Sequence, residues 1–305
     1  MAVRVTAVVV TYNRRESLLR CLAALEGQAG TPPAILVVDN AGTDGTEQAL
    51  LPLQAAGRLR YHRTAENLGG AGGFQLGIRL AAEAGAQLLW LMDDDCLPEP
   101  GALQALLAAH DRLGGQYGFL SGMAYWRDGS PCRMNIQRTG LHRKLQDRES
   151  ALVPVTMATF VSLLVPVERV RAVGLPLREF FIWADDLEYT RRLSRRYACY
   201  AVPASRVLHD MHSNGRVDIA TDAPERLPRY ACLYRNEVYL YRREGLRGWL
   251  YLLSRTALHL LRALRAPDGR RRAGIVWRSF CAGLHFAPAV EYLPDELPAG
   301  GCTAP

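Results

Sequence analysis

Three consecutive acidic residues follow an apolar run in the stretch WLMDDDCLP, Trp90 to Pro98. Like charges repel, so three neighbouring carboxylates are expected to face a positive partner. Side chains alternate along a strand, so Asp93 and Asp95 should point to one side and Asp94 to the other. Two carboxylates on one side suit Mg²⁺ or Mn²⁺, which keeps open positions for phosphate oxygens. The triplet therefore predicts a divalent cation that bridges to a diphosphate, with a solvated acidic loop as the alternative.

Two other apolar runs also end in polar residues. The first is followed by TYNRRES, in which Thr11, Tyr12 and Asn13 can meet a nucleobase or a ribose. The second ends in DNAGTDGT, where Asp39 can accept the N3–H of a uracil or thymine ring. Each signal is weak alone because acids often cap turns. Together they indicate a nucleotide site.

A glycine-rich segment, ENLGGAGGFQLG, occupies residues 66–77. Glycines such as Gly69 and Gly70 let the backbone approach a ligand closely, and a helix beginning near Ala71 would aim N–H groups at a diphosphate. The spacing matches neither the Walker pattern nor the dinucleotide GxGxxG pattern. A flexible loop before a helix is therefore the alternative.

The elements that must position these residues form an alternating pattern. Between the apolar runs, residues such as Leu18, Leu22 and Leu25 repeat at helical spacing. Runs without polar alternation are typical of strands buried on both faces of a parallel sheet, so we predict an α/β sandwich with a mostly parallel central sheet. Ligands bind beyond the carboxyl ends of such strands, which places the polar segments on one rim. The runs lie at 3–10, 34–39, 87–92 and 119–126.

The pattern changes in the second half of the chain. Residues 127–150 carry turn formers and charges without an apolar period, which predicts a long loop of the kind that often forms a lid. The run at 155–166 predicts a strand, and residues 183–196 predict a helix that follows an acidic pair. The segments CYAVP and RVLH predict two short strands.

The last part of the chain is basic. Residues 223–305 hold 13 basic and 7 acidic side chains, against 24 and 23 in residues 1–222. A helix over 246–265 would carry Arg255, His259 and Arg262 on one side and apolar residues over most of the rest. Such a helix suits an anionic membrane surface, and it also suits packing on the core or on a second copy of the chain.

The compartment follows from cysteine usage and from hydropathy. Seven cysteines without a CxxC pair fit a reducing compartment better than a disulfide framework. Met1 leads almost directly into the first apolar run, and no run approaches the roughly 20 residues that span a bilayer. We expect a cytoplasmic protein, peripheral on the inner face of the plasma membrane if the tail binds lipid. Nucleic acid is not an expected partner, because the basic tail has a strong apolar face instead of a groove lined with aromatic and basic residues.

Five motifs, in this order, resemble family 2 glycosyltransferases of the GT-A fold: VVVTYNR, ILVVDNAGTDGT, ENLGGAGGF, LMDDD and FFIWADDLEYTRR. The resemblance covers about residues 3–215 and implies a nucleotide-sugar-binding α/β/α sandwich. We therefore expect a catalytic domain at 1–215 and a helical, basic extension at 216–305 for acceptor, membrane-surface or oligomer contact. NLGGAGGF and WADDLEY, with a histidine after them, are most similar to galactofuranosyltransferases, and rhamnosyltransferases carry closely similar motifs.

The resemblance also implies roles for individual residues. It puts Asp93 and Asp95 on the metal, with His209 as a third ligand and His212 as the alternative to it. Asp94 would lie near the sugar nucleotide. The catalytic base would be Asp186, while Asp185 would contact the acceptor or the donor sugar, and the nucleotide would be lined by Thr11, Asn13, Asp39 and Asn67.

These observations predict an inverting, metal-dependent glycosyltransferase that uses Mn²⁺ or Mg²⁺. It would move galactofuranose from UDP-galactofuranose onto a hydroxyl of a saccharide or lipid-linked saccharide in cell-wall or surface polysaccharide synthesis. One carboxylate to take the acceptor proton and one metal to stabilise the departing diphosphate suffice for this chemistry. A rhamnosyltransferase using dTDP-rhamnose is the second hypothesis, and a non-catalytic nucleotide-diphosphate-binding protein is a remoter one.

Overall fold

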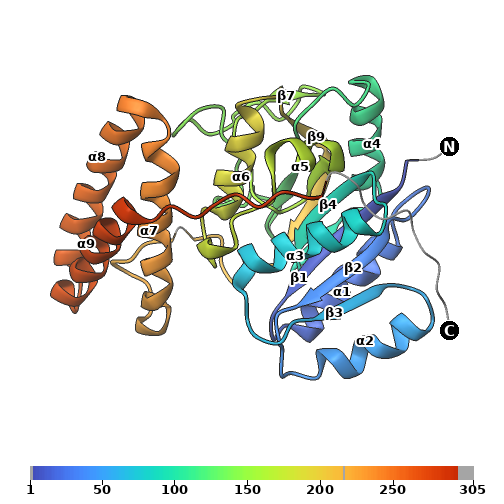
Figure 1. Cartoon of the computed structure of the whole chain (residues 1–305), viewed down its shortest axis with the longest axis horizontal. Helices are drawn as coiled ribbons and strands as arrows, with labels where there is room; N and C mark the ends of the chain where they lie inside the picture. The colour runs from blue at the N-terminus through green and yellow to red at the C-terminus, as the bar shows by residue number, and fades with distance from the viewer. Residues whose placement is uncertain (1–2, 216, 295–305) are drawn as a thin grey trace.

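The computed structural model describes residues 3–215 and 217–294 and shows one mixed β-sheet with helices on both faces (Figure 1). Three further helices stand together at one end of the molecule. The strands run in the order β3-β2-β1-β4-β8-β6-β9-β5, and β7 pairs with β9. Their bounds are β1 (Val5–Thr11), β2 (Ala34–Asp39), β3 (Arg60–Arg63), β4 (Leu88–Asp93), β5 (Cys96–Pro98), β6 (Leu120–Tyr125), β7 (Val153–Pro154), β8 (Leu163–Pro166) and β9 (Tyr200–His209).

The carboxyl ends of β1, β2 and β4 meet at one edge of the sheet. β1 lies between β2 and β4 and is parallel to both. Thr11 lies opposite Asp39 on one side, and Val10 lies opposite Asp93 on the other. The strand ends that the sequence places on one rim therefore do share it.

The other half of the sheet is mixed. β8 is antiparallel to β4 and to β6, whereas β6 and β9 are parallel. β9 then pairs antiparallel with β5, so that His209 lies opposite Cys96. The sheet is thus parallel around β1 and mixed beyond β4, and this change of direction brings the end of β9 to the acidic triplet.

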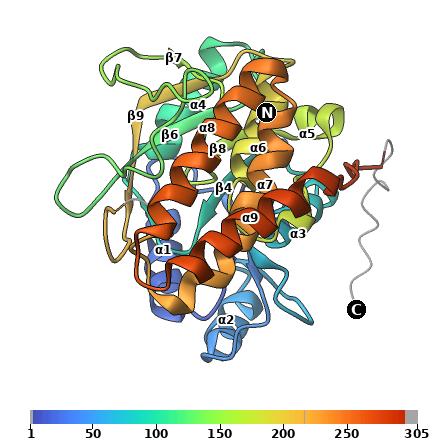
Figure 2. The same cartoon turned by 90° about the vertical axis from the view of Figure 1, so that its left-hand side faces the viewer.

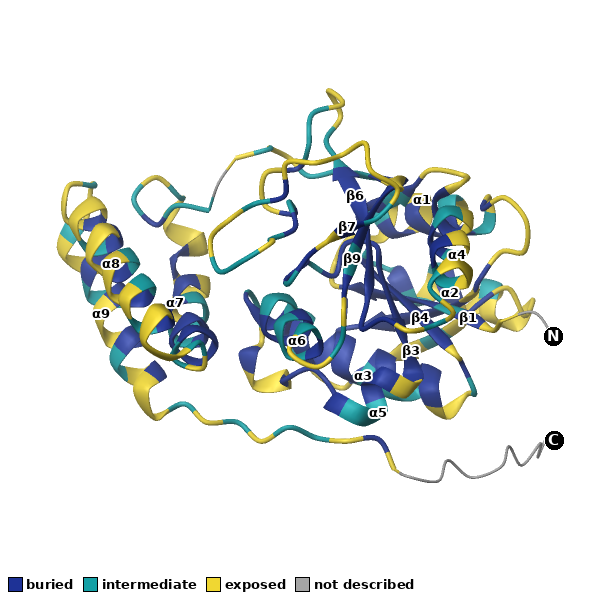
Figure 3. Ribbon diagram, turned by 90° about the horizontal axis from the view of Figure 1, so that it is seen from above, coloured by how far each residue is buried: buried dark blue, intermediate teal, exposed yellow. Residues whose placement is uncertain are grey.

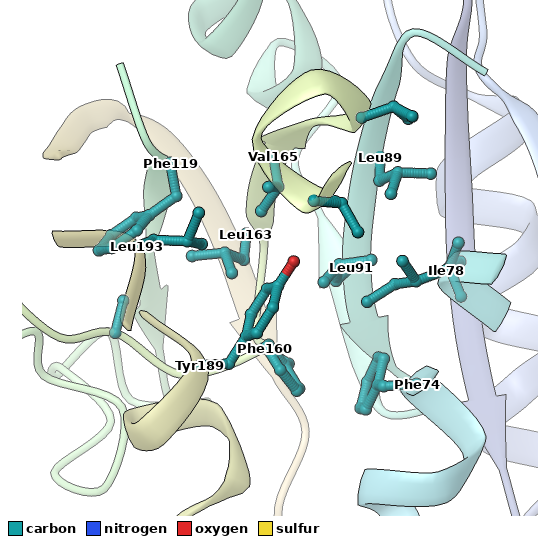
Figure 4. Packing of buried hydrophobic residues seen from close by; sticks show 14 of the residues in the cluster. Phe74, Ile78, Leu89, Leu91, Phe119, Phe160, Leu163, Val165, Tyr189 and Leu193 are labelled. Atoms are coloured by element: carbon teal, nitrogen blue, oxygen red, sulfur yellow. The ribbon is translucent and has the colours of Figure 1, made fainter. Parts of the chain in front are cut away.

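Two layers of helices cover the sheet because alternate residues of its central strands face opposite sides. Val8 and Val10 pack with Phe74 and Ile78 of α3, while Val9 packs against the helices of the opposite face. Figure 4 shows the first cluster, with Phe74 beside Phe160. The predicted α/β sandwich is confirmed. One layer holds α1 (Arg15–Glu26), α2 (Thr46–Ala55) and α4 (Ala102–Arg112), and the other holds α3 (Gly69–Glu83), α5 (Val167–Val173) and α6 (Asp185–Ser194).

The glycine-rich segment is the first half of helix α3 and not a loop before it. The helix begins at Gly69, two residues earlier than the sequence predicts. A Cβ at Gly73 would lie 2.5 Å from Val10 Cγ1, and a Cβ at Gly77 would lie 2.4 Å from Val8 Cγ1. These glycines therefore let the helix backbone approach β1 closely, which is a packing role that the sequence pattern does not distinguish from ligand approach.

Residues 127–150 are irregular, as predicted, but they pack against the rest of the protein. Cys132, Asn135 and Gln137 are buried, and Gln137 donates a hydrogen bond to the carbonyl oxygen of Gly122 in β6. The segment also reaches the C-terminal helices, where Arg138 donates to the hydroxyl oxygen of Tyr241 over 2.9 Å. This segment lacks a periodic apolar face, and hydrogen bonds from its polar side chains hold it in place.

Two strand predictions were wrong. The run at 155–166 is a strand only at its end, β8, although most of its apolar residues are buried. A buried segment without strand pairing has the same apolar composition as a buried strand, so the hydropathy pattern cannot distinguish the two. CYAVP and RVLH are not two strands but parts of one, β9, whose pairing with β6 is interrupted by a register shift between Ala201 and Arg206.

The C-terminal helices pack on one another and are tied back to the sheet domain. Figure 2 shows α8 and α9 as the outer pair at this end, with α7 behind them. The chain then returns along the sheet part of the molecule, where Leu175 donates a backbone hydrogen bond to Glu291 and Leu293 enters the core. In the part of the chain that the structure describes, no helix is long and apolar enough to cross a membrane. The three helices are α7 (Leu227–Arg242), α8 (Gly245–Leu264) and α9 (Gly269–His285).

Candidate active site

The acidic triplet lies where β4 ends, and it faces Arg14 at the start of α1. Arg14 Nη1 lies 2.5 Å from Asp95 Oδ2 and 3.4 Å from Asp94 Oδ1. The predicted alternation was therefore wrong, because β4 ends at Asp93 and the next two residues form a turn that aims both carboxylates at one guanidinium. The positive partner that the triplet requires is supplied, in this structure, by Arg14.

Asp94 is also tied to the end of β1. Thr11 Oγ1 donates a hydrogen bond to Asp94 Oδ2 over 2.7 Å, and both side chains are buried. Burial raises the pKa of Asp94 to about 6, although Arg14 and the Thr11 hydroxyl favour the charged form. Thr11 and Asp94, two of the residues expected near the nucleotide, are therefore direct neighbours.

His209 joins the triplet from the end of β9. Its Nε2 lies 2.9 Å from Asp95 Oδ1, and its Nδ1 lies 2.9 Å from the amide oxygen of Asn135. Burial lowers the pKa of His209, but hydrogen bonds with Asp95 and Cys132 and the charge of Asp95 outweigh burial and raise it to about 10. The structure brings His209 to the acids, whereas His212 is exposed.

The donor set at this place fits a hard divalent cation. Asp95, Cys96 and His209 offer ligand atoms that all lie within 4.8 Å of one another. Burial raises the pKa of the Cys96 thiol well above its usual value, which leaves a carboxylate and an imidazole as the suitable ligands. Asp93 stands outside this group but interacts with it, since burial and the charge of Asp95 raise the pKa of Asp93 to about 7.

Asp39, the residue expected to read a nucleobase, is fully buried at the end of β2. Its Oδ1 accepts the backbone N–H of Gly42 over 2.8 Å, and its Oδ2 accepts the hydroxyl of Tyr61 over 2.7 Å. Asn13 lies next to this turn and accepts the backbone N–H of Thr43 over 2.6 Å. Tyr12, by contrast, is 47 % exposed. Both oxygens of Asp39 thus already have one protein partner, whereas the Tyr12 side chain is about half exposed at this rim.

The start of α3 packs against the loop that precedes Asp185 and Asp186. Asn67 Oδ1 accepts the backbone N–H of Gly69 over 2.8 Å, and Asn67 also lines a cavity of about 500 Å³ with Phe181. Gly69 has φ +69°, and a Cβ there would lie 2.1 Å from the carbonyl oxygen of Phe181. A Cβ at Gly70 would meet nothing within 4 Å. Gly69 therefore has a conformational and packing role, whereas Gly70 leaves open space.

The loop before α6 has an unusual backbone that other segments hold in place. Phe181, Trp183 and Ala184 have φ between 62° and 66°, in the left-handed region that non-glycine residues seldom occupy. Asn236 of α7 is fully buried, and its Nδ2 lies 3.0, 3.2 and 2.8 Å from the carbonyl oxygens of Phe180, Ile182 and Trp183. The C-terminal helices thus fix the loop that starts α6.

Asp185 and Asp186 occupy the first turn of α6 and differ in their surroundings. Burial raises the pKa of Asp185 well above its usual range, and the charges of Asp186 and Asp93 raise it further. Burial also raises the pKa of Asp186, but the Leu187 N–H at 2.7 Å and the charge of Arg138 oppose it, and the value is about 6. Asp186 is therefore ionised at neutral pH. The segment at 157–159 links the acid pair to the triplet, because Ala158 bonds Thr190 of α6 and Thr159 bonds Asn135, the partner of His209.

Sequence reasoning did not identify four residues of this site. They are two cations, Arg14 and Arg138, the phenol of Tyr61, and the buried amide of Asn236. Arg14 had a signal, since it follows TYN directly beside predicted site residues. The other three lie in segments without a chemical motif. Only the folded structure brings them close to the site residues.

This chain is similar in sequence to known glycosyltransferases. Residues 6–165 match the family described as glycosyl transferase family 2. The galactofuranosyltransferase GlfT1 of Mycolicibacterium smegmatis is 32% identical over 287 residues, which cover 85% of this chain and 93% of that protein. The N-acetylglucosaminyl-diphospho-decaprenol L-rhamnosyltransferase of Mycobacterium tuberculosis is 30% identical over 240 residues, 68% of this chain and 77% of that protein.

Solved structures with low sequence identity share the fold. Staphylococcus aureus TarS 1-349 has a TM-score of 0.55 and 13% identity, over 92% of this chain and 71% of that one. GalNAc-T7 with UDP, GalNAc and Mn²⁺ has a TM-score of 0.65 and 14% identity, over 93% of this chain and 56% of that one. These overlaps show that the fold is of the GT-A type.

Proposed function

Because this chain belongs to glycosyltransferase family 2, we propose that it transfers galactofuranose from UDP-galactofuranose to a hydroxyl of a lipid-linked saccharide. It is a glycosyltransferase of the galactofuranosyltransferase and rhamnosyltransferase branch, and inversion is the general stereochemical course of the family. The match to GlfT1 along 93% of that protein supports galactofuranose as the donor sugar. The match to a rhamnosyltransferase keeps dTDP-rhamnose as the second candidate.

The catalytic base that we propose is Asp186. An inverting transfer needs a carboxylate that takes the proton of the acceptor hydroxyl as this oxygen attacks the anomeric carbon. Asp186 is ionised at neutral pH, because the Leu187 N–H and Arg138 counteract its burial. Asp185, which stays protonated at higher pH, is suited to donate a hydrogen bond to a sugar hydroxyl.

Asp95 and His209 are the proposed ligands of Mn²⁺ or Mg²⁺, with Asp93 as the neighbouring carboxylate. When bound there, such a cation would neutralise negative charge on the departing diphosphate. Asp95 can receive a cation only if Arg14 moves aside, since Arg14 Nη1 lies 2.5 Å from it. His209 must release its Nε2 proton, which Asp95 now accepts in a hydrogen bond. We propose that Thr11, Asn13, Asp39 and Asn67 bind the nucleotide beside these ligands.

One arrangement carries the proposal: His209, beside the triplet, is joined through Asn135 to Thr159. The preceding residue, Ala158, exchanges hydrogen bonds with Thr190 of α6, one turn after Asp186. The triplet and the acid pair, about 90 positions apart in the sequence, are thus held against the same short segment, and a transferase needs a base and a diphosphate-binding group on either side of one sugar. A protein that only bound a nucleotide diphosphate would need the triplet but not the acid pair. The arrangement therefore favours transfer over binding alone.

The test is a panel of UDP- and dTDP-sugars with purified full-length protein. We expect UDP-galactofuranose to be hydrolysed slowly without acceptor, with a rate that rises when Mn²⁺ or Mg²⁺ is added. Asp186→Asn should lower acceptor-dependent transfer at least about 100-fold, because general base catalysis contributes 10²–10⁴-fold. Asp128→Asn, an exposed aspartate in the 127–150 segment, is the matched control. Near-normal transfer by Asp186→Asn would remove this residue as the base, and preference for dTDP-rhamnose would favour the second donor.

A further inference from the structure

Helix α8 is oriented with its polar side inward. Arg255 Nε lies 3.0 Å from both carboxylate oxygens of Glu237 on α7, and the His259 ring accepts or donates at 2.8 Å to the Tyr234 hydroxyl. Thr256, between them on the helix, is 7% exposed. Two of the three residues of the predicted polar face, Arg255 and His259, are therefore used for packing inside the protein, and the third, Arg262, is half exposed and pairs with Asp218.

The leucine side of α8 consequently faces outward. Figure 3 shows exposed residues along the outer side of this helix. Positions 246, 250, 253, 257, 261 and 264 follow helical spacing and form one stripe along almost the whole helix. All of these positions are exposed, and five of the six are leucine: Leu246 76%, Leu250 60%, Leu253 51%, Leu261 54% and Leu264 56%.

Helix α9 extends this apolar surface. Trp277 is 56% exposed and stacks on Phe280, with ring centroids 6.0 Å apart. Phe280 packs in one cluster with Leu252 of α8, so Trp277 lies near the seam between the two helices. Figures 1 and 2 show that α8 and α9 form the outer end of the molecule, away from the sheet. We call the leucine stripe of α8 together with Trp277 the outer apolar face.

The two helices that carry the outer apolar face are rich in positive charge. Residues 245–285 contain eight arginines and one acidic residue, Asp268. Two of the arginines, Arg255 and Arg272, are turned inward to Glu237 and to backbone carbonyl oxygens. The other six are exposed: Arg262 pairs with Asp218 over 2.8 Å, and the rest are Arg247, Arg265, Arg270, Arg271 and Arg278.

We propose that the outer apolar face docks on an anionic phospholipid surface. Leucine and tryptophan side chains would enter the boundary between headgroups and acyl chains, and the exposed arginines would lie at the lipid phosphates. The charge argues against a second copy of the chain as the occupant, because two such faces would bring their arginines together with one acid on each side. The proposal rests on the surface itself, and it accords with the lipid-linked acceptor proposed above.

This docking would act near the site through α7. Glu237, which holds Arg255 of α8, is adjacent in sequence to Asn236, which holds the loop before Asp185 and Asp186. The outer face and the acid pair are thus connected through two neighbouring residues of one helix. A bilayer on α8 and α9 would set the position of the acid pair relative to the membrane surface from which a lipid-linked saccharide projects.

The test uses the full chain and vesicles of phosphatidylcholine, with and without phosphatidylglycerol. We expect co-sedimentation with the anionic vesicles and much less with the neutral ones, and release as salt screens the charges. The triple variant Leu250→Ser, Leu253→Ser, Leu261→Ser should bind at least about tenfold more weakly for each leucine removed. Arg247→Glu with Arg265→Glu should also weaken binding and leave the leucines in place.

Two controls separate this proposal from folding defects and from the proposed function. Leu51→Ser changes a leucine of α2 that is 47% exposed and should leave vesicle binding unchanged. Donor hydrolysis in solution should be the same for wild type and the α8 variants, so failure of vesicle binding can be told apart from failure of the transferase assignment. Equal binding of the triple leucine variant and wild type would overturn the proposal. A wild-type dimer in lipid-free buffer that the triple variant converts to a monomer would overturn it in favour of a second copy.

Discussion

Replacing Asn236 with alanine tests whether the C-terminal helices position the acid pair. Asn236 is 0% exposed, and its amide nitrogen lies within 3.2 Å of three backbone carbonyl oxygens in residues 180–183. The Phe180 carbonyl oxygen keeps two other donors, the Ile182 N–H at 2.7 Å and Arg235 Nη2 at 3.4 Å, so the carbonyl oxygens of Ile182 and Trp183 are affected most. A buried polar group left without a partner costs about 1–3 kcal/mol, so we expect Asn236→Ala to lower the free energy of unfolding by about 2–4 kcal/mol.

The same substitution should lower the catalytic rate of the molecules that remain folded. Phe181, Trp183 and Ala184 hold left-handed φ angles that cost about 1–3 kcal/mol each and persist only when their surroundings impose them. Without Asn236 the loop can relax, and the start of α6 at Asp185 relaxes with it. We expect kcat for transfer to fall more than the KM for donor changes, because the residues proposed to bind the nucleotide lie on β1, β2 and the start of α3 and not on α6.

The assays are urea unfolding and steady-state transfer, each normalised to folded protein. Asn236→Asp should be worse than Asn236→Ala, because a carboxylate oxygen would then face three carbonyl oxygens in a buried place. Asn214→Ala is the matched control, since Asn214 also donates to a backbone carbonyl, that of Pro131, but lies away from α6. The reasoning would be refuted if Asn236→Ala changed stability by less than about 0.5 kcal/mol, or if kcat per folded molecule stayed normal.

Three further predictions concern packing, protonation and the nucleotide rim. Gly77→Ala should lower the free energy of unfolding by about 1–3 kcal/mol in urea, because its Cβ would lie 2.4 Å from Val8 Cγ1 and force α3 away from β1. The pH profile of kcat/KM should fall tenfold per unit below about pH 6, because Asp186 can accept a proton only when ionised and its pKa is raised to about 6. Tyr61→Phe should destabilise the protein by about 1–2 kcal/mol and weaken UDP binding in calorimetry, because the buried Asp39 loses its 2.7 Å partner.

Each of these predictions has a contradicting result, and the two substitutions have matched controls. Gly101→Ala should be neutral, since a Cβ there meets nothing within 4 Å, and equal stability of the two alanine variants would contradict the packing role of α3. A kcat/KM profile that stays flat down to pH 5 would show that Asp186 does not limit the reaction. Tyr292→Phe removes a hydroxyl at a 56% exposed site and should change neither stability nor UDP binding. If Tyr61→Phe also changed neither, the hydrogen bond from Tyr61 to Asp39 would not be required for them.

The sequence alone predicted those strands and helices whose hydropathy pattern depends on residues close together in the chain. Buried strands ending at Thr11, Asp39 and Asp93 were readable from apolar runs followed by polar residues, and parallel strands bring such ends to one rim. The acid pair at the start of α6 and the helix over α8 were readable for the same reason, because helical periodicity is set by neighbours three and four residues away. Motif order along the chain was enough to indicate the family that the comparisons then showed.

Only the tertiary structure decided which face of each helix is buried and which residues it contacts. The polar side of α8 turned inward because Glu237 and Tyr234 of α7 offer partners, and no local pattern carries that information. The glycines of α3 allow close packing of this helix on β1. The acidic triplet contacts Arg14, which lies 80 residues earlier in the sequence. Periodicity specifies that a helix has two faces, but the partner of each face is chosen by contacts between distant segments, whose energies depend on the whole fold.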